Sequence, residues 1–345
     1  MQNKTMKALV KTGKGRESVR LLDVPIPTPG DGEVLIKVMA CGICGTDEHI
    51  MHDAYLHTIP VILGHEFTGI VTKTGPNVDN LAVGDQVVAL SAQKSCGGCK
   101  YCRMGDYVHC TQKKSIGIDL GGGMAEYIVT TARRTFKVPD SFIGKDILAI
   151  TEPLACCVRA VLEKSHIHAG DVVVVSGPGV IGLLCMQLAK LCGAFVIVTG
   201  TPADKARLEL AKRLGADVAN EEPSRVLDIV QTYAPYGADH VLECSGAAPS
   251  LKTALECVRK EGSLTQVGMY GKNVDVPMDT VVRKELKLTA GFSQAMSTWE
   301  LALKIIGQDV LKLEELVSAR MRLEDWEKAF DLFESKTENK IFLIP

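Results

Sequence analysis

The chain has 345 residues, a formal net charge of -2 and 46% hydrophobic residues against 23% charged ones. This length favours two domains, and the composition is ordinary for a soluble globular protein. A net charge so close to zero argues against a nucleic-acid partner, which requires a surplus of basic residues. The lysine-bearing N-terminus lacks the apolar core of a signal peptide, so we expect a cytoplasmic protein with reduced thiols.

The first 150 residues contain short alternating runs that are punctuated by glycine and proline. These runs are EVLIKVMA (33–40), TGIVTKTG (68–75), DQVVALSA (85–92) and AEYIVTTA (125–132). Alternation with period two is typical of half-buried strands, and the spacing of the runs predicts a mainly antiparallel β domain.

Two glycine-bearing segments of this region combine a thiol, an imidazole and a carboxylate. Cys44 lies in MACGICGTDEH (39–49), and His65 and Glu66 lie in LGHEFTG (63–69). Catalytic zinc is held by three protein ligands and keeps one open position. Taken singly, a His–Glu pair is more often a satisfied polar pair, and a lone cysteine is more often a packing residue.

Four of the twelve cysteines follow on one polar, glycine-bearing loop: Cys96, Cys99, Cys102 and Cys110. A disulfide framework is not expected for reduced thiols. An iron–sulfur cluster is the alternative, but the loop lacks the distant or proline-flanked fourth cysteine of the usual cluster motifs. The spacing C-x2-C-x2-C-x7-C therefore predicts a structural zinc site, whose closed ligand shell does no chemistry.

Residues 172–189 carry no charge, and their number alone would permit a membrane span. The sequence SGPG interrupts this run, so a strand, a turn and a helix explain it better, and we expect no membrane partner. Gly177, Gly179 and Gly182 form G-x-G-x-x-G between the strand and the helix, the context of a dinucleotide-binding loop. The helix N-terminus would offer free amides to a pyrophosphate.

Helices and strands continue to alternate after this loop. Helices are predicted at 204–217 and 250–258, and strands at 239–246, 262–271 and 285–293. Repeated βα units imply a parallel sheet that is covered on both faces. A further helix at 297–307 leads to a strand-like tail at 338–345, which we expect to rejoin the first domain.

Together these motifs resemble the zinc-dependent medium-chain alcohol dehydrogenases, in the branch of sorbitol and other polyol dehydrogenases and threonine 3-dehydrogenase. The likeness spans nearly the whole chain and is carried by CGICGTDEH, LGHEFTGIV, GDQVV, the four-cysteine loop, TEPLACCV, GPGVIG and LECSG. It implies an α/β protein with a GroES-like, mainly β catalytic domain over 1–152 and 297–345, including a zinc lobe at about 94–112. A doubly wound Rossmann dinucleotide-binding domain would occupy 153–296, and the protein would be a homo-oligomer, a dimer or a tetramer.

The resemblance also implies the ligands of a catalytic zinc. Cys44 and His65 match the zinc ligands of the family, and Glu66 and Glu152 resemble carboxylates that bind the metal directly or through water in the polyol branch. Without the family, Glu152 would be read equally well as a strand-end carboxylate. A site with a single thiolate should leave zinc a stronger Lewis acid, which suits a chelating diol.

Two more residues match a proton relay of the family. Thr46 and His49 would carry the hydroxyl proton from the substrate through the cofactor ribose to solvent, and Asp47 would orient neighbouring donors. Taken alone, Thr46 could be a turn hydroxyl and His49 a surface histidine.

Cofactor contacts are expected across the second domain, at Gly177, Gly179, Val180, Ile181, Gly182, Gly200, Thr201, Lys205, Arg207, Ser245, Gly268 and Phe292. An NAD enzyme usually carries an acidic residue at the end of the second strand, but Gly200 stands there. Thr201, Lys205 and Arg207 could bind a 2′-phosphate, so the sequence leans to NADP. NAD stays open, because Asp204 could supply the acid and the two cations could be solvated helix residues.

The predicted function is NAD(P)-dependent oxidation of a secondary alcohol, a polyol or sugar alcohol, to a ketose. L-threonine, diols and sugar phosphates are alternative substrates. A non-enzymatic dinucleotide-binding protein and a zinc-module interaction protein are more distant alternatives. The intact set of candidate zinc ligands argues against the first of these, and the acidic charge balance argues against the second.

Overall fold

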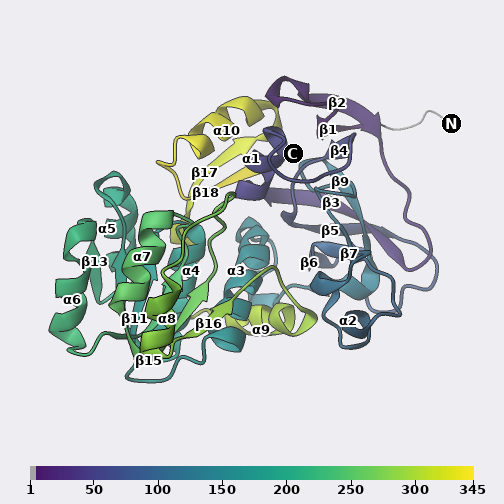
Figure 1. Ribbon diagram of the computed structural model, residues 1–345. Helices are drawn as coiled ribbons and strands as arrows, with labels where there is room; N and C mark the ends of the chain where they lie inside the picture. The colour runs from purple at the N-terminus through teal and green to yellow at the C-terminus, as the bar shows by residue number, and fades with distance from the viewer. Residues whose placement is uncertain (1–4) are drawn as a thin grey trace. The chain divides into compact units, whose positions relative to one another are not determined.

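The computed structural model describes residues 5–345, and the chain divides into two compact units (Figure 1). The first unit combines the residues up to Pro153 with Gln294–Pro345, and the second unit is Leu154–Ser293. The boundary near Pro153 falls inside helix α3 (Thr151–Val158). Within the described range, no helix has both the length and the apolar character needed to cross a membrane.

A seven-stranded sheet lies at the centre of the first unit in the part of the chain that is described. Its strand order is β10-β6-β5-β3-β18-β17, and β9 also pairs with β3. The strands are β3 (Glu33–Gly42), β5 (Glu66–Thr74), β6 (Gln86–Ala89), β9 (Tyr127–Thr131), β10 (Thr135–Lys137), β17 (Val317–Arg322) and β18 (Lys340–Ile344). All pairs are antiparallel except β17 with β18, so the predicted antiparallel character is confirmed.

The C-terminal tail lies in this sheet beside β3. Phe342 pairs with Gly42 and Leu343 pairs with Cys41. The side chains of Phe342 and Leu343 are fully buried, because the tail is apolar and packs into the core of the unit. This pairing brings Lys340, the first residue of β18, close to the carboxyl end of β3.

Smaller elements surround the main sheet of the first unit. A three-stranded sheet has the order β2-β1-β4, and a two-stranded ribbon pairs β7 with β8. These strands are β1 (Thr5–Lys11), β2 (Val19–Pro25), β4 (Val61–Ile62), β7 (Ala92–Lys94) and β8 (Lys114–Ser115). The helices are α1 (Gly45–Met51), α2 (Lys100–Arg103), α9 (Met296–Gly307) and α10 (Trp326–Glu334).

The second unit is built on a parallel sheet with the order β13-β12-β11-β14-β15-β16. Its strands are β11 (Val172–Ser176), β12 (Phe195–Thr199), β13 (Val218–Asn220), β14 (Ala238–Glu243), β15 (Val258–Gln266) and β16 (Lys287–Ala290). Every pair is parallel. The chain first proceeds outward from β11 to β13 and then returns to β14, so the strand order reverses between β11 and β14. Ligands of such sheets bind at the carboxyl ends of the strands at this reversal.

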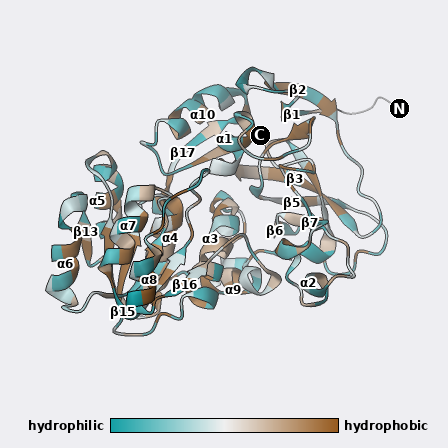
Figure 2. Ribbon diagram, viewed as in Figure 1, coloured by the Kyte–Doolittle hydropathy of each residue, from teal (hydrophilic) through white to brown (hydrophobic). Residues whose placement is uncertain are grey.

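Helices connect the strands of the second unit: α4 (Val180–Leu191), α5 (Lys205–Leu214), α6 (Val226–Tyr233), α7 (Ala248–Cys257) and α8 (Met278–Lys284). In Figure 2, α6 carries both hydrophilic and hydrophobic segments, as expected for a helix with one buried face. The strand predicted at 262–271 runs instead from Val258 to Gln266. It ends there because the amides of Val267 and Gly268 both donate to the carbonyl oxygen of Glu243.

Candidate metal and nucleotide sites

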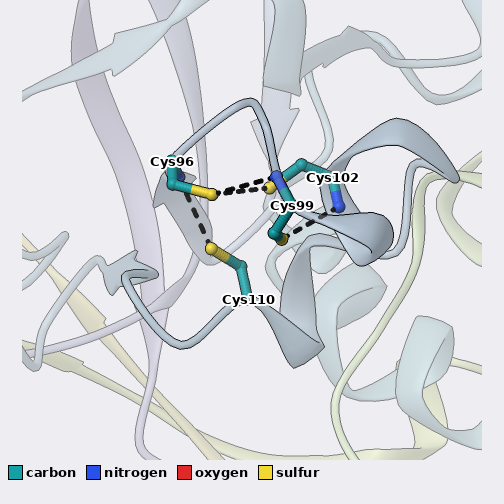
Figure 3. Close-up of side chains that lie close together, drawn as sticks. All are labelled: Cys96, Cys99, Cys102 and Cys110. Carbon is teal, nitrogen blue, oxygen red and sulfur yellow. Dashed lines mark hydrogen bonds between the residues drawn. The ribbon is translucent and has the colours of Figure 1, made fainter.

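Four cysteines gather on the loop between β7 and β8, which also carries the one-turn helix α2 (Figure 3). Backbone amides point at neighbouring sulfurs, with N–Sγ distances of 3.3 Å from Cys99 to Cys96 and 3.4 Å from Cys102 to Cys99. The Cys96 amide lies 3.4 Å from the Cys110 sulfur. All four sulfur atoms lie within 4.8 Å of one another. The structure thus brings together the four cysteines that the spacing singled out.

The thiols of this four-cysteine cluster have shifted pKa values. The amides of Cys99 and Gly98 lower the pKa of Cys96, and the Ser95 hydroxyl lowers the pKa of Cys102 to about 6. The Cys102 amide acts to lower the pKa of Cys99, but burial and the neighbouring thiols outweigh it and raise that pKa to about 11. Four thiolates this close would repel one another, so their full ionisation requires a cation among them. The cluster therefore fits a tetrahedral zinc ion.

Arg134 supports the four-cysteine loop, a role that the sequence did not reveal. Its guanidinium donates to the carbonyl oxygen of Ala92 and to Oγ of Ser95, both at 2.6 Å. The same group lies 4.0 Å from the centroid of the Tyr107 ring. Because Ser95 in turn hydrogen-bonds Cys102, Arg134 fixes the loop on the side of a candidate ligand.

A second cluster forms in the first unit from two separate segments. Cys44 is the N-cap of α1, His65 directly precedes β5, and Glu66 begins that strand. One ligand atom from each of these residues lies within 4.8 Å of the others. Gly64 permits this approach, since its φ is 90° and a Cβ there would come within 2.6 Å of the Cys41 sulfur. Three of the four predicted catalytic ligands are thus together, and we call them the Cys44 cluster.

Asp47 ties the two segments of the Cys44 cluster together. Its Oδ2 accepts from the Cys44 amide and its Oδ1 from the Gly64 amide, both at 3.0 Å. Oδ1 also lies 3.7 Å from Nδ1 of His65. Burial raises the pKa of Asp47, and His65 acts in the opposite direction. In this place the carboxylate orients the ligand-bearing segments.

The tail strand β18 contributes a buried cation to this cluster, which the sequence did not reveal. Nζ of Lys340 donates to Oε2 of Glu66 at 2.6 Å and to the carbonyl oxygen of Ile43 at 2.9 Å. Lys340 is only 4% exposed. Burial acts to lower the pKa of Lys340, but Glu66 and Cys44 outweigh it and raise that pKa. A carboxylate has two oxygens, so Glu66 can accept from Lys340 with one and bind a metal with the other.

Glu152 lies outside the group of three, although it is buried nearby and interacts with His65. Its Oε1 accepts from Nε2 of Gln294, whose own Oε1 lies 3.2 Å from Oγ of Ser91. Burial raises the pKa of Glu152 to about 7, against the effect of His65. The structure thus gives Glu152 a partner in Gln294, and its role as a zinc ligand stays a prediction.

The state of His65 indicates that the Cys44 cluster fits a metal ion. Nδ1 of His65 is buried and has no hydrogen-bond partner within residues 5–345. Burial acts to lower the pKa of His65, but Asp47 and Cys44 outweigh it and raise that pKa well above its ordinary value. The cluster therefore favours a positive charge at its centre, and thiolate, imidazole and carboxylate are the donors that zinc takes.

Thr46 and His49 lie on α1, within the two turns that follow Cys44. Thr46 is half-buried and His49 is exposed. The relay that the family resemblance implies stays a prediction.

In the second unit, the glycine-rich loop joins β11 to α4. Gly177 has a φ of 95°, and a Cβ there would lie 2.7 Å from the Cα of Ser245. Gly179 is the N-cap of α4. A Cβ on Gly182 would lie 1.9 Å from the carbonyl oxygen of Gly177. The three glycines therefore serve the tight turn, the helix start and the close packing of helix on loop, as in dinucleotide-binding loops.

The other predicted cofactor contacts come from three places in the second unit: α4, the start of α5 and the segment after β16. Val180 and Ile181 form the first turn of α4, where backbone amides lack intrahelical partners and can bind a pyrophosphate. Lys205 is exposed at the start of α5. Phe292 follows β16 and is 45% exposed.

The end of β12 is the position that distinguishes NAD from NADP. Gly200 follows the strand, and a Cβ there would come within 3.1 Å of Pro178. Asp204 accepts at Oδ2 from the amide of Thr201 at 3.0 Å and from its hydroxyl at 2.8 Å. Nη1 of Arg207 lies 3.5 Å from Oδ1 of Asp204. Asp204 thus caps the turn that begins at Thr201 and forms an ion pair with Arg207.

A buried carboxylate, Glu243, organises the carboxyl end of β14. Its side chain accepts from the amide of Ser245 at 3.0 Å and from the amide of Gly246 at 3.1 Å. It also accepts from Nε2 of Gln266 at 2.6 Å, and its backbone carbonyl accepts from the Gly268 amide at 2.8 Å. Ser245 and Gly268 therefore share one network beside the glycine-rich loop. The signal that could have identified Glu243 is a charged residue at the end of an apolar strand.

Two family models match the chain. The alcohol dehydrogenase GroES-like domain matches residues 30–140, and the zinc-binding dehydrogenase model matches residues 180–308. The predicted fold class, a GroES-like and mainly β domain with a doubly wound α/β domain, is confirmed.

Individual relatives match over almost their full length. D-arabitol-phosphate dehydrogenase of Enterococcus avium is 37% identical over 99% of this chain and 98% of the relative. Sorbitol dehydrogenase of Halalkalibacterium halodurans is 37% identical over 99% of each chain. Among solved structures, a zinc-binding dehydrogenase from Sinorhizobium meliloti bound to NADP has a TM-score of 0.89 and 33% identity, and the match covers 99% of this chain and 100% of that one.

Proposed function

Because this chain belongs to the zinc-dependent medium-chain alcohol dehydrogenase family, we propose that it oxidises a secondary hydroxyl of a polyol and transfers a hydride to a nicotinamide cofactor. The observation that carries this proposal is the Cys44 cluster, in which a thiol, an imidazole and a carboxylate converge within 4.8 Å. A non-enzymatic dinucleotide-binding protein would have no need for these three groups to meet.

Cys44, His65 and Glu66 would hold the catalytic zinc, with Glu152 as a direct or water-mediated ligand. The zinc ion would supply a Lewis acid for the substrate hydroxyl, and the nicotinamide cofactor would accept the hydride. Asp47 holds the backbone of both ligand-bearing segments, and Lys340 fixes one oxygen of Glu66. The protein residues thus set the positions of the ligands before a substrate arrives.

Thr46 and His49 would move the proton. The Thr46 hydroxyl would accept the proton of the substrate hydroxyl and donate its own along the relay, and the exposed imidazole of His49 would release a proton to water. Cys96, Cys99, Cys102 and Cys110 would hold a second zinc ion whose role is structural, because four sulfurs leave no open coordination position.

We propose that the second unit binds NADP in preference to NAD. Gly200 places no acidic side chain at the end of β12, and Asp204 already accepts two hydrogen bonds from Thr201. Lys205 and Arg207 would contact the 2′-phosphate. The solved structure of the NADP-bound relative from Sinorhizobium meliloti supports this choice. Steady-state kinetics with both cofactors test it, and Arg207→Ala should raise the KM for NADP and leave the KM for NAD unchanged. A large preference of the unmodified enzyme for NAD would contradict the proposal.

The substrate class we propose is a free polyol, on the basis of the sorbitol dehydrogenase relative. A polyol phosphate is the second candidate, because the D-arabitol-phosphate dehydrogenase relative is equally identical. The test is a panel of sorbitol, D-arabitol, D-arabitol phosphate, 2,3-butanediol and L-threonine, with reduced cofactor followed by absorbance. No turnover with any of these alcohols by zinc-loaded enzyme would contradict the proposed function.

We further propose that the protein is a cytoplasmic homo-oligomer, a dimer or a tetramer. The half-buried Cys192, which belongs to neither proposed zinc site, supports a reducing compartment, since accessible thiols oxidise elsewhere. Light scattering coupled to size-exclusion chromatography would give the mass of the assembly, and a monomer would contradict this proposal.

A further inference from the structure

Three side chains that the proposed dehydrogenase function does not use form a hydrogen-bonded chain in the second unit. Asp171 directly precedes β11, His240 lies on β14, and Ser263 lies opposite His240 on β15. Oγ of Ser263 lies 2.5 Å from Nδ1 of His240, and Oδ2 of Asp171 lies 3.1 Å from Nε2. Asp171 and His240 lie toward the amino-terminal ends of β11 and β14, whereas the glycine-rich loop follows the carboxyl end of β11.

The carboxylate fixes which ring nitrogen carries the hydrogen. An ionised Asp171 can only accept, so Nε2 of His240 is the donor and Nδ1 keeps its lone pair. The Ser263 hydroxyl then donates to Nδ1. Asp171 is itself held by the amide of His168, which donates to Oδ2 at 2.7 Å. The order of carboxylate, imidazole and hydroxyl is that of hydrolytic serine triads, with the roles of the two ring nitrogens exchanged.

These three side chains line a cavity of about 240 Å³, which gives room for a small acyl group. The side chain of His240 is 13% exposed and borders the cavity. Burial lowers the pKa of His240 although Asp171 acts in the opposite direction, so the ring is neutral at pH 7 and Nδ1 can accept a proton. Lys164 and Lys287 line the same cavity, as do Arg259, Asp239 and Glu261. In the proposed reaction the basic groups would stabilise the oxyanion.

We propose that Ser263, His240 and Asp171 form a second catalytic site that hydrolyses small carboxylic esters such as aryl acetates. Oγ of Ser263 attacks the carbonyl carbon, and its proton passes to Nδ1 of His240. The bond between the carbonyl carbon and the leaving oxygen breaks, and the leaving group takes that proton. Water then attacks the acyl-serine by the same route, which releases the carboxylic acid and restores the hydroxyl.

The full chain is tested with 4-nitrophenyl acetate and, separately, with a fluorophosphonate probe. We expect ester hydrolysis that falls about 100-fold in Ser263→Ala and in His240→Gln, since positioned acid–base groups contribute about 10² to 10⁴ in rate. The probe should label the tryptic peptide over residues 261–272, in which Ser263 is the only serine. The control is Ser335→Ala, because Ser335 is exposed and its hydroxyl donates to a backbone carbonyl. It should retain full hydrolysis and labelling.

Several outcomes would overturn this proposal. One is ester hydrolysis in folded Ser263→Ala at the unmodified rate, and another is fluorophosphonate found only on other residues. Cys44→Ser separates the two sites, because hydrolysis that this variant loses and Ser263→Ala keeps would belong to the Cys44 cluster. Labelling of the unmodified protein decides the question even if a variant fails to fold. Complete absence of hydrolysis and of label would also overturn it.

Discussion

The two candidate metal clusters of the first unit differ in the origin of their ligands. The four-cysteine cluster takes every ligand from one loop, and backbone amides donate to its sulfurs. The Cys44 cluster takes its ligands from the start of α1 and the start of β5, and buried charged side chains hold it: Asp47 from α1 and Lys340 from the tail strand. The ligands of the four-cysteine cluster are close together in the sequence. Those of the Cys44 cluster are brought together only by the folding of the first unit.

This difference has a consequence for how each cluster would bind zinc. Four thiolates would saturate a zinc ion and leave it no open position, so the four-cysteine cluster would contribute to stability alone. In the Cys44 cluster, Lys340 donates to Oε2 of Glu66 and would leave the other carboxylate oxygen to a metal. Three protein ligands would leave one coordination position open, which suits a site that must admit a substrate oxygen.

Substitution of the thiolate in the Cys44 cluster should have the largest effect. We expect Cys44→Ser to reduce turnover by more than about 100-fold, because loss of a ligand exceeds the 10- to 100-fold typical of an outer partner. The fold and the zinc of the four-cysteine cluster should remain. Steady-state rates, zinc content and thermal melting measure these effects. Cys192→Ser, at the half-buried end of α4, is the matched control. Near-normal turnover in Cys44→Ser would show that the site assignment is wrong.

The four-cysteine cluster should show the opposite pattern. Cys102→Ser is expected to lower the melting temperature and the zinc content, because zinc in a closed site contributes directly to folding free energy. Turnover per folded molecule should stay within about twofold, since this cluster has no open coordination position. Calorimetry with zinc analysis checks both statements. An unchanged melting temperature together with lost turnover would reverse the roles of the two clusters.

The same contrast explains what could be predicted from the sequence. The four-cysteine cluster was predicted because its spacing is local, and the strands and helices followed from period and punctuation. Lys340 and Gln294 were missed, because each reaches its partner only through tertiary folding. A lysine that begins an apolar strand is usually solvated, so the sequence around Lys340 carries no signal of a buried ion pair. Arg134 was missed for the same reason.

Removal of the buried cation tests whether the Cys44 cluster depends on charge balance. Lys340→Met should destabilise the zinc-free protein by about 3–5 kcal/mol, because it leaves the Glu66 carboxylate buried without a partner. The loss should be smaller with zinc present, since the metal then neutralises Glu66. Urea unfolding of unmodified and variant protein with and without zinc measures the difference. Lys340→Arg, which keeps the charge, is the control. Equal losses in both states would argue that zinc does not contact Glu66.

The smallest expected effect concerns the far end of α1, which begins at the Cys44 cluster. Asp53 accepts from the Gly15 amide at 2.6 Å and lies 3.1 Å from Nζ of the buried Lys11. The Gly15 amide, followed by Lys11, lowers the pKa of Asp53 below 3.8. A carboxyl group whose pKa is lower in the folded state stabilises the protein above its unfolded pKa. The contribution disappears as the pH falls through the lowered, folded value.

The difference in urea midpoint between the unmodified protein and Asp53→Asn should therefore be constant from pH 7 to about 5 and shrink at lower pH. Asparagine keeps the backbone shape, because it tolerates the φ of 58° at this position. Zinc retention by the four-cysteine cluster should not change, since none of its ligands contacts Asp53 or Lys11. A difference that grows on acidification would mean that Asp53 has a raised pKa in the folded protein. The Gly15 amide and Lys11 would then not stabilise the ionised form of Asp53.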